Sequence, residues 1–290
     1  MPSRLSIPPF PDHVPTADIT TVDFDFLSRG DQAEARKGQD VARGNGFFYV
    51  KNHPVNSDFM FDLANKVFQL PLDEKLKHDM GTKGRHSGCK RSGSQYADEK
   101  GTPDQSEFYN VSRDDILRIG DAEPLKHPQP AKARRAELER FTESSHHAVT
   151  VVTRALSEQL GLGPDALPSL HRIDRTGGDQ ARVTQAPPAS ARTITLGALS
   201  TAEPPTRVHS CVYFSRPTGH VPLRSLFAGP LLDGEEKAPT ADEWVVKRAV
   251  LRSTADDKGT ETFHRSRGTE HTRDRGRAAL NAPRNEVEAV

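Results

Sequence analysis

Aromatic residues, cysteines and long apolar runs are all scarce in this sequence of 290 residues. Aromatic side chains make up 6% and charged side chains 28% of the chain, which indicates that part of its length lies outside a packed core. The two cysteines, Cys89 and Cys211, are too few for a disulfide framework and share no metal-ligand spacing, so a reducing compartment is expected. No apolar run approaches the length of about 18 residues that a membrane-spanning helix needs.

An excess of charge of either sign is also absent, since 40 Lys and Arg residues balance 40 Asp and Glu residues. A balanced surface exerts no general attraction on nucleic acid or on anionic membranes. The first residues, "MPSRLSIPPFPDHVP", carry prolines where a signal peptide needs an apolar run. We therefore expect a soluble cytoplasmic protein that has neither nucleic acid nor a membrane as a partner.

Local patterns predict a mixture of helices and strands. Strands are expected over 17–27 and over the apolar run 46–55, and a helix over 31–43 that ends near two glycines. A second helix is expected from Asp58 to just before Pro71, because its apolar residues recur on one face. The further expected elements are a Gly- and Ser-rich loop (81–105), a long helix (130–160), three β-like runs (179–188, 192–198 and 210–217) and a short helix (241–252).

Four motifs follow one another in a recognisable order. They are "VPTADITTVDF" (14–24), "GNGFFYVKNHPV" (44–55), "VFQLPLDEKLKHDM" (67–80) and "GCKRSGSQYADEKGTPDQSEFYNVSRDDI" (88–116). In these motifs the chain resembles the iron- and 2-oxoglutarate-dependent oxygenases of the isopenicillin N synthase-like family, in particular fungal members from secondary metabolism. The later runs 181–197 and 210–226 resemble strands of the catalytic barrel of that family.

The resemblance implies an α+β fold, in which N-terminal helices and strands pack on a double-stranded β-helix, or jelly roll, that is truncated here. The expected divisions are an N-terminal region (1–125), a connecting helix (126–163), the truncated catalytic region (164–252) and a disordered tail (253–290). The tail is expected to be disordered because it is charged and almost free of large apolar residues.

The metal ligands of such an oxygenase have no counterpart in this sequence. The family binds Fe(II) through a His-x-Asp motif and a distant second histidine. In the run "GALSTAE", Leu199 stands at the histidine position and Thr201 at the carboxylate position, and none of the 12 histidines is followed two residues later by Asp or Glu. Only 13 steps separate Gly197 from Ser210, too few for the central strands of a jelly roll. We therefore assign no catalytic and no metal-binding residue.

Arg207 and Ser210 are the candidates for binding the carboxylate of 2-oxoglutarate, because a guanidinium and a hydroxyl can share the two oxygens of a carboxylate. The family spacing is Arg-x-Ser, whereas the spacing here is one residue longer. On a strand this difference places the two side chains on opposite faces. His209, between them, is expected to be a structural residue of the strand and not a metal ligand.

The segment "GSQYADEKGTPDQSEFY" (93–109) leaves two interpretations open. Its polar residues Tyr96, Glu107 and Tyr109 could line the mouth of a substrate site in a complete relative. Alternatively, the segment is a surface hairpin without a role in binding.

The resemblance implies an oxidoreductase that uses Fe(II) and 2-oxoglutarate to oxidise a small molecule of secondary metabolism. Without the metal triad, the chain as it stands is expected to be inactive. Two alternatives stay open: a non-catalytic remnant that binds a partner or small molecule, or a misplaced intron boundary in the gene of an active dioxygenase. Loss of the central strands also predicts unpaired closing strands and a poorly packed C-terminal half.

Overall fold

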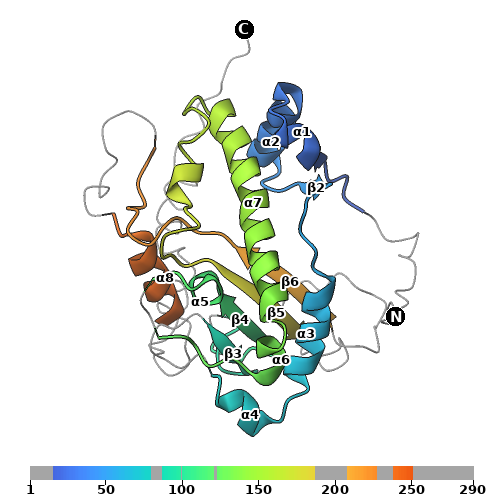
Figure 1. Cartoon of the computed structure of the whole chain (residues 1–290), viewed down its shortest axis with the longest axis vertical. Coiled ribbons are helices and arrows are strands. Elements are labelled where there is room, and N and C mark those ends of the chain that lie inside the picture. The colour runs from blue at the N-terminus through green and yellow to red at the C-terminus, as the bar shows by residue number, and fades with distance from the viewer. Residues whose placement is uncertain are drawn as a thin grey trace.

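The computed structural model of the chain contains both helices and strands, as the sequence predicts (Figure 1). The residues that it describes are 16–79, 87–98, 100–120, 123–186, 208–226 and 238–250. The expected run at 192–198 and the expected disordered tail lie outside these residues. Within them, no helix is long and apolar enough to cross a membrane.

The N-terminal region begins with a small parallel pair of strands, β1 (Thr21–Asp23) and β2 (Tyr49–Lys51). Two helices connect them, α1 (Phe24–Ser28) and α2 (Gln32–Gly44). The expected strand over 17–27 is therefore wrong in its second half. The Asp23 side chain accepts a hydrogen bond from the Asp25 amide at 3.0 Å and caps a helix there instead.

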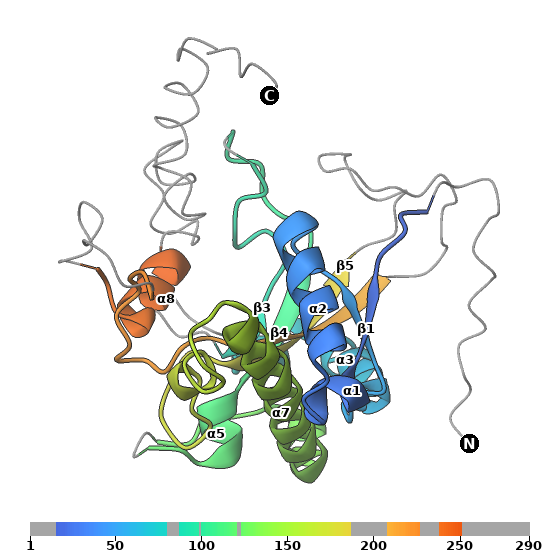
Figure 2. The same ribbon diagram turned by 90° about the horizontal axis from the view of Figure 1, so that it is seen from above.

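The remaining helices differ widely in length. They are α3 (Asp58–Phe68), α4 (Leu72–Leu76), α5 (Arg113–Leu117), α6 (Gln129–Lys132), α7 (Arg135–Gln159), a 3₁₀ helix (Pro168–Leu170) and α8 (Ala241–Val250). The long helix α7 runs through the middle of the described structure (Figure 1). Helices α1 and α2 pack beside one of its ends, and α3 and α6 lie beside the other (Figure 1). Figure 2 shows α8 on the far side of the sheet from α1 and α2.

Four antiparallel strands form the main sheet in the order β3-β4-β5-β6. Their bounds are β3 (Gly88–Lys90), β4 (Glu107–Ser112), β5 (Gln180–Ala186) and β6 (Val208–Phe214). β6 pairs with β5 along its whole length, from Gln180 opposite Phe214 to Ala186 opposite Val208. The closing strand β6 therefore keeps a ladder partner on one side, contrary to the expectation, and it is the edge strand of the sheet within the described residues.

One face of this sheet packs on α3, α6 and α7 and forms the main core. Its buried or partly buried residues are Cys89, Tyr109, Val111, Ala181, Val183, Cys211 and Tyr213, packed against Met60, Leu63, Val67, Ala131, Leu138 and Phe141 of the helices. A smaller core joins Val22 and Leu27 to Ala35 and Ala155, which fixes α1 and α2 on α7. The alternation of side chains along each strand leaves a second face, which bears the polar and basic residues considered next.

Candidate functional site

The residues predicted to bind 2-oxoglutarate are only partly described. Ser210 lies on β6, is exposed, and is opposite Thr184 of β5 on the second face of the sheet. Arg207 directly precedes β6 and lies outside the described residues, as do Leu199 and Thr201. The proposed Arg207 and Ser210 pair therefore stays a prediction.

His209 lies on the helix-facing side of β6, opposite to Ser210. Its Nε2 is 3.0 Å from Oε1 of Gln185, and its ring stacks on Phe68 with 6.0 Å between ring centroids. The first contact joins the imidazole to β5 and the second holds it against α3, which agrees with the structural role expected from the sequence.

Glu107 and Tyr109 also face the helices and not an open mouth. Glu107 accepts hydrogen bonds from Nζ of Lys75 at 2.9 Å and from Nε2 of Gln185 at 2.7 Å. Tyr109 is 1% exposed, and its hydroxyl lies 2.6 Å from Nδ1 of His127, whose Nε2 contacts Oδ2 of Asp115. Burial raises the pKa of Tyr109 well above its usual range. In this structure, therefore, these two polar residues of β4 are structural.

The second face of the sheet bears a row of alternating cations and aromatic rings. The guanidinium carbon of Arg182 lies 3.9 Å from the ring centroid of Phe108 and 4.9 Å from that of Phe214. At the β3 end of the row, Nζ of Lys90 lies 5.4 Å from the ring centroid of Phe108. At the β6 end, the guanidinium carbon of Arg216 lies 5.1 Å from the ring centroid of Phe214. Each contact is within the range of cation–π attraction. Residues of β3, β4, β5 and β6 are thus joined across the sheet.

Arg182 is fixed in this row by a further contact. Its Nε donates a hydrogen bond of 2.7 Å to Oδ1 of Asn110, a residue with no exposed surface. The planar guanidinium is thereby held between two rings with a defined orientation. Val212 of β6 is opposite Arg182 of β5 and is 38% exposed, so this face is more open than the helix-facing one.

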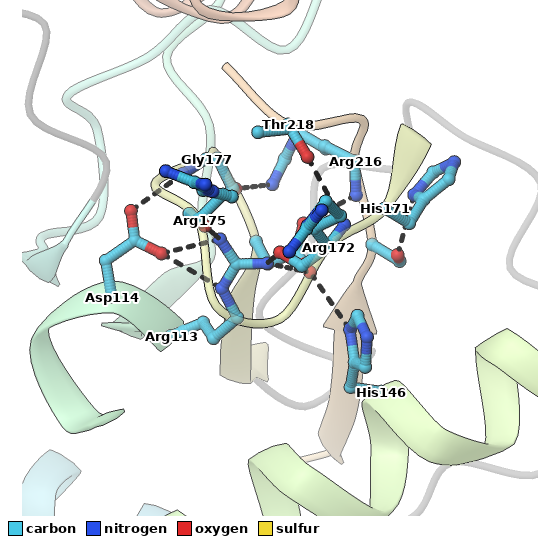
Figure 3. A network of polar contacts seen from close by, with 12 residues as sticks. Arg113, Asp114, His146, His171, Arg172, Arg175, Gly177, Arg216 and Thr218 are labelled. Carbon is cyan, nitrogen blue, oxygen red and sulfur yellow. Dashed lines mark hydrogen bonds and ion pairs between the residues drawn. The ribbon is translucent and has the colours of Figure 1, made fainter. Parts of the chain in front are cut away.

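A buried polar network lies at the start of β5 (Figure 3). Asp179 is its centre: Oδ2 accepts hydrogen bonds from Nη1 of Arg113 at 3.2 Å and from the Tyr213 hydroxyl at 3.1 Å, and Oδ1 accepts one from the Arg216 amide at 2.7 Å. Burial alone would raise the pKa of Asp179, but contacts with His146, Arg113, Arg216 and Tyr213 together hold it below its usual value. The carboxylate is therefore charged and fully engaged.

Arg113 connects this centre to the neighbouring loop. Its Nε donates to Oδ1 of Asp114 at 2.9 Å, and its Nη1 and Nη2 donate to the carbonyls of Arg172 and Arg175. Burial raises the pKa of Asp114, although Arg113 and the Gly177 amide oppose this effect. The network thus ties the start of α5 to the loop before β5.

These residues were not assigned any role from the sequence, although a signal exists. Arg113 directly follows the apolar strand β4, and Asp179 directly precedes β5. A charged residue at the end of a buried strand needs a partner of opposite charge, and these two residues supply it to each other.

The described residues do not fit the iron site of the family. Two histidines, His146 and His171, lie in the polar network around Asp179, and Figure 3 labels both of them. Nδ1 of His146 is 3.9 Å from Oδ2 of Asp179. However, both Asp179 oxygens already accept hydrogen bonds, and the described part of the chain contains no group of three His, Cys, Asp or Glu side chains that could hold a metal.

Comparison with known proteins agrees with this architecture. Residues 14–134 match the family model described as "non-haem dioxygenase in morphine synthesis N-terminal". A 2-oxoglutarate-Fe(II) type oxidoreductase of Metarhizium rileyi is 28% identical over 171 residues, which cover 53% of this chain and 46% of that protein. Isopenicillin N synthase of Streptomyces jumonjinensis is 38% identical over 72 residues, 23% of this chain and 21% of that protein. The chain thus spans less than half the length of these curated relatives.

Solved structures share the fold at low sequence identity. A full-length Neurospora crassa protein, crystallised in complex with alpha-KG, superposes with a TM-score of 0.60 at 18% identity, covering 80% of this chain and 95% of that chain. A 2OG-Fe(II) oxygenase family protein from Caulobacter crescentus superposes with a TM-score of 0.61 at 15% identity, covering 79% and 97%. The four ordered motifs, the family model and the shared fold agree. Over its N-terminal region the chain is therefore similar to the iron- and 2-oxoglutarate-dependent oxygenases that include isopenicillin N synthase, a family whose cofactors are Fe(II) and 2-oxoglutarate, and it shares their fold.

Proposed function

We propose that this chain derives from an oxidoreductase that oxidises a small molecule of secondary metabolism, and that the sequence as it stands does not carry out that reaction. The oxidoreductase part of the proposal is supported by the Metarhizium relative and by the N-terminal motifs. A small-molecule substrate is supported by the Neurospora crassa protein, which was also crystallised with 5-formyluracil and in that complex superposes with a TM-score of 0.59. The chain has only two cysteines, too few for a disulfide framework, which supports a location in the reducing cytoplasm.

The observation that carries the inactivity proposal is the absence of any His-x-Asp or His-x-Glu in the full sequence. Fe(II) in this family supplies the oxidising chemistry, and it needs two imidazoles and one carboxylate that converge. Leu199 has no donor atom, and the hydroxyl of Thr201 is neutral, so neither replaces the missing ligands.

A second candidate function is binding without catalysis. The helix-facing core is continuous from α3 through the sheet to α7, and β6 completes its ladder with β5. A scaffold of this kind can bind a small molecule or a partner without iron. The third interpretation is a misplaced intron boundary. In that case the gene encodes a longer protein, and that longer protein carries out the reaction.

Two measurements separate these candidates. The purified chain is incubated anaerobically with Fe(II), desalted and analysed for iron, and succinate formation from 2-oxoglutarate is then measured in air. The Metarhizium oxidoreductase serves as the active control. We expect iron far below one equivalent and succinate at the level of the protein-free blank, whereas one equivalent of iron with succinate formation overturns the proposal. Sequencing of the transcript decides whether a longer barrel is encoded.

A further inference from the structure

A cavity of about 630 Å³ lies between the start of α3 and the first half of α7, away from the second face of the sheet. Its size falls within the range of about 300–1,000 Å³ that is typical of small-molecule sites. The residues that line it are Pro54, Asn56, Asp58, Phe59, Asp62, Arg134, Glu137, Arg140, Phe141, Glu143 and Ser144. Figure 1 shows the two helices side by side at this point.

The floor of the cavity is apolar. Phe59 of α3 and Phe141 of α7 meet edge to face, with ring centroids 5.9 Å apart and planes at 74°. Phe141 is 4% exposed, so its ring is fixed by the core behind it. Pro54 adds a third apolar surface. A flat apolar ligand body can therefore rest on rings that do not need to rearrange.

The rim carries more negative than positive charge, with four carboxylates against two guanidinium groups. Arg134 is already engaged: its Nη1 donates to the Phe59 carbonyl at 3.0 Å, and it lies 3.8 Å from an Asp62 oxygen and 3.6 Å from a Glu137 oxygen. Asp58 and Glu143 have no ion-pair partner within the described chain. The remaining charge of the rim is therefore negative even when Arg140 is counted.

We propose that this cavity binds a small organic cation whose apolar body rests on Phe59 and Phe141 and whose ammonium group faces the carboxylates of Asp58 and Glu143. The rings contribute apolar contact area, most of it from Phe59 because Phe141 is 4% exposed, and the carboxylates contribute charge-assisted hydrogen bonds. A merely solvated helix surface has similar charges, but it has no hollow with an apolar floor. The site is independent of iron and of the proposed oxidoreductase ancestry.

Three probes of matched size test the proposed charge preference: 2-phenylethylamine, 2-phenylethanol and 3-phenylpropanoate. Binding to the full chain is measured by ligand-observed NMR and by calorimetry at low salt. We expect the amine to bind at least about tenfold more tightly than the alcohol, the propanoate not to bind, and the amine to weaken in about 0.5 M salt. Equal binding of amine and alcohol, or no binding of the amine, overturns the proposal.

Variants test the location of the site. Glu143→Gln removes one rim charge while keeping the shape, and we expect it to raise the Kd for the amine at least about fivefold. Glu139→Gln is the matched control on the same helix, because Glu139 pairs with Arg135 and does not line the cavity. We expect no change in the control. If Glu143→Gln binds the amine like the unchanged chain while its circular dichroism and Tm are unaltered, the site is not this cavity.

Discussion

Arg113 and Asp179 are 66 residues apart in the sequence, yet Nη1 of Arg113 lies 3.2 Å from Oδ2 of Asp179, with exposed side-chain fractions of 1% and 0%. The pair joins the start of α5, which follows the N-terminal motifs, to the start of β5, which begins the later part of the sheet. Through Tyr213 the same carboxylate reaches β6. The N-terminal half and the β5–β6 pair are thus linked by one buried ion pair.

Asp179→Asn is expected to be strongly destabilising. The amide cannot balance the buried charge of Arg113, so the free energy of unfolding should fall by about 3–5 kcal/mol. Urea denaturation followed by circular dichroism measures this value. The control is Asp165→Asn, which breaks an exposed pair with Arg154 in which Asp165 is 75% exposed, and should cost less than about 1 kcal/mol. Equal losses for the two variants would contradict the assigned role of Asp179.

The stability of the protein should fall as the pH drops from about 7.5 to about 5. Burial lowers the pKa of His171 below its ordinary value of 6.5, so the unfolded chain binds the proton more readily in this window. Thermal unfolding at several pH values measures the effect. His171→Asn keeps a polar atom near the Ser215 hydroxyl, which now lies 3.3 Å from Nδ1 of His171, and should flatten the profile. An unchanged slope in this variant would exclude His171 as the cause.

A separate loss of stability is expected at lower pH. The pKa of Asp179 is held below the ordinary value of 3.8, so its contribution is present above that pH and is lost as the pH falls through its folded value. His171→Asn should keep this second transition. Asp179→Asn should reduce it, with the remainder due to other carboxylates of lowered pKa such as Asp115, and acid titration of the two variants can distinguish these outcomes.

Arg182→Lys is expected to destabilise the sheet although the charge is retained. A lysine has no planar group to lie between Phe108 and Phe214, and it cannot reproduce the Nε hydrogen bond to Asn110. We expect a loss of about 1–2 kcal/mol in the free energy of unfolding. Lys51→Arg, at an exposed position of β2, is the control and should change the stability little. A neutral result for Arg182→Lys would show that charge alone matters in the row.

Tyr109→Phe should cost about 1–2 kcal/mol, because it leaves Nδ1 of the buried His127 without its partner. Tyr49→Phe is the matched control, since Tyr49 is 60% exposed. Chemical denaturation of both variants measures the difference. Equal stabilities of the two variants would mean that the Tyr109 hydroxyl contributes nothing to the fold.

Local sequence patterns were sufficient to predict the helices whose apolar residues recur on one face. The helix from Asp58 to Phe68 and most of the helix from Arg135 to Gln159 have apolar residues on one face, and their helical form follows. The end of β1 was missed because the cap made by Asp23 competes with the strand pattern around it.

Contacts between distant segments could not be predicted in the same way. The partners of Arg113 are set by how the loop before β5 meets α5, and one sequence does not contain that information. The pairing of β6 was likewise missed. The expectation took as its neighbours the central family strands that have no counterpart in the sequence, whereas β5 pairs with β6 on one side. The family was recognisable because its motifs lie in short segments with fixed order.

The register of β5 and β6 has an evolutionary consequence. Ala186, the last residue of β5, is directly opposite Val208, the first residue of β6. The end of β5 and the start of β6 are therefore adjacent, and the two ends of the segment that connects them are held together by the ladder itself. Closure of a longer connection costs little more than closure of a short one. This position is a natural point for excision or insertion of whole strands, since either change leaves the register on both sides intact.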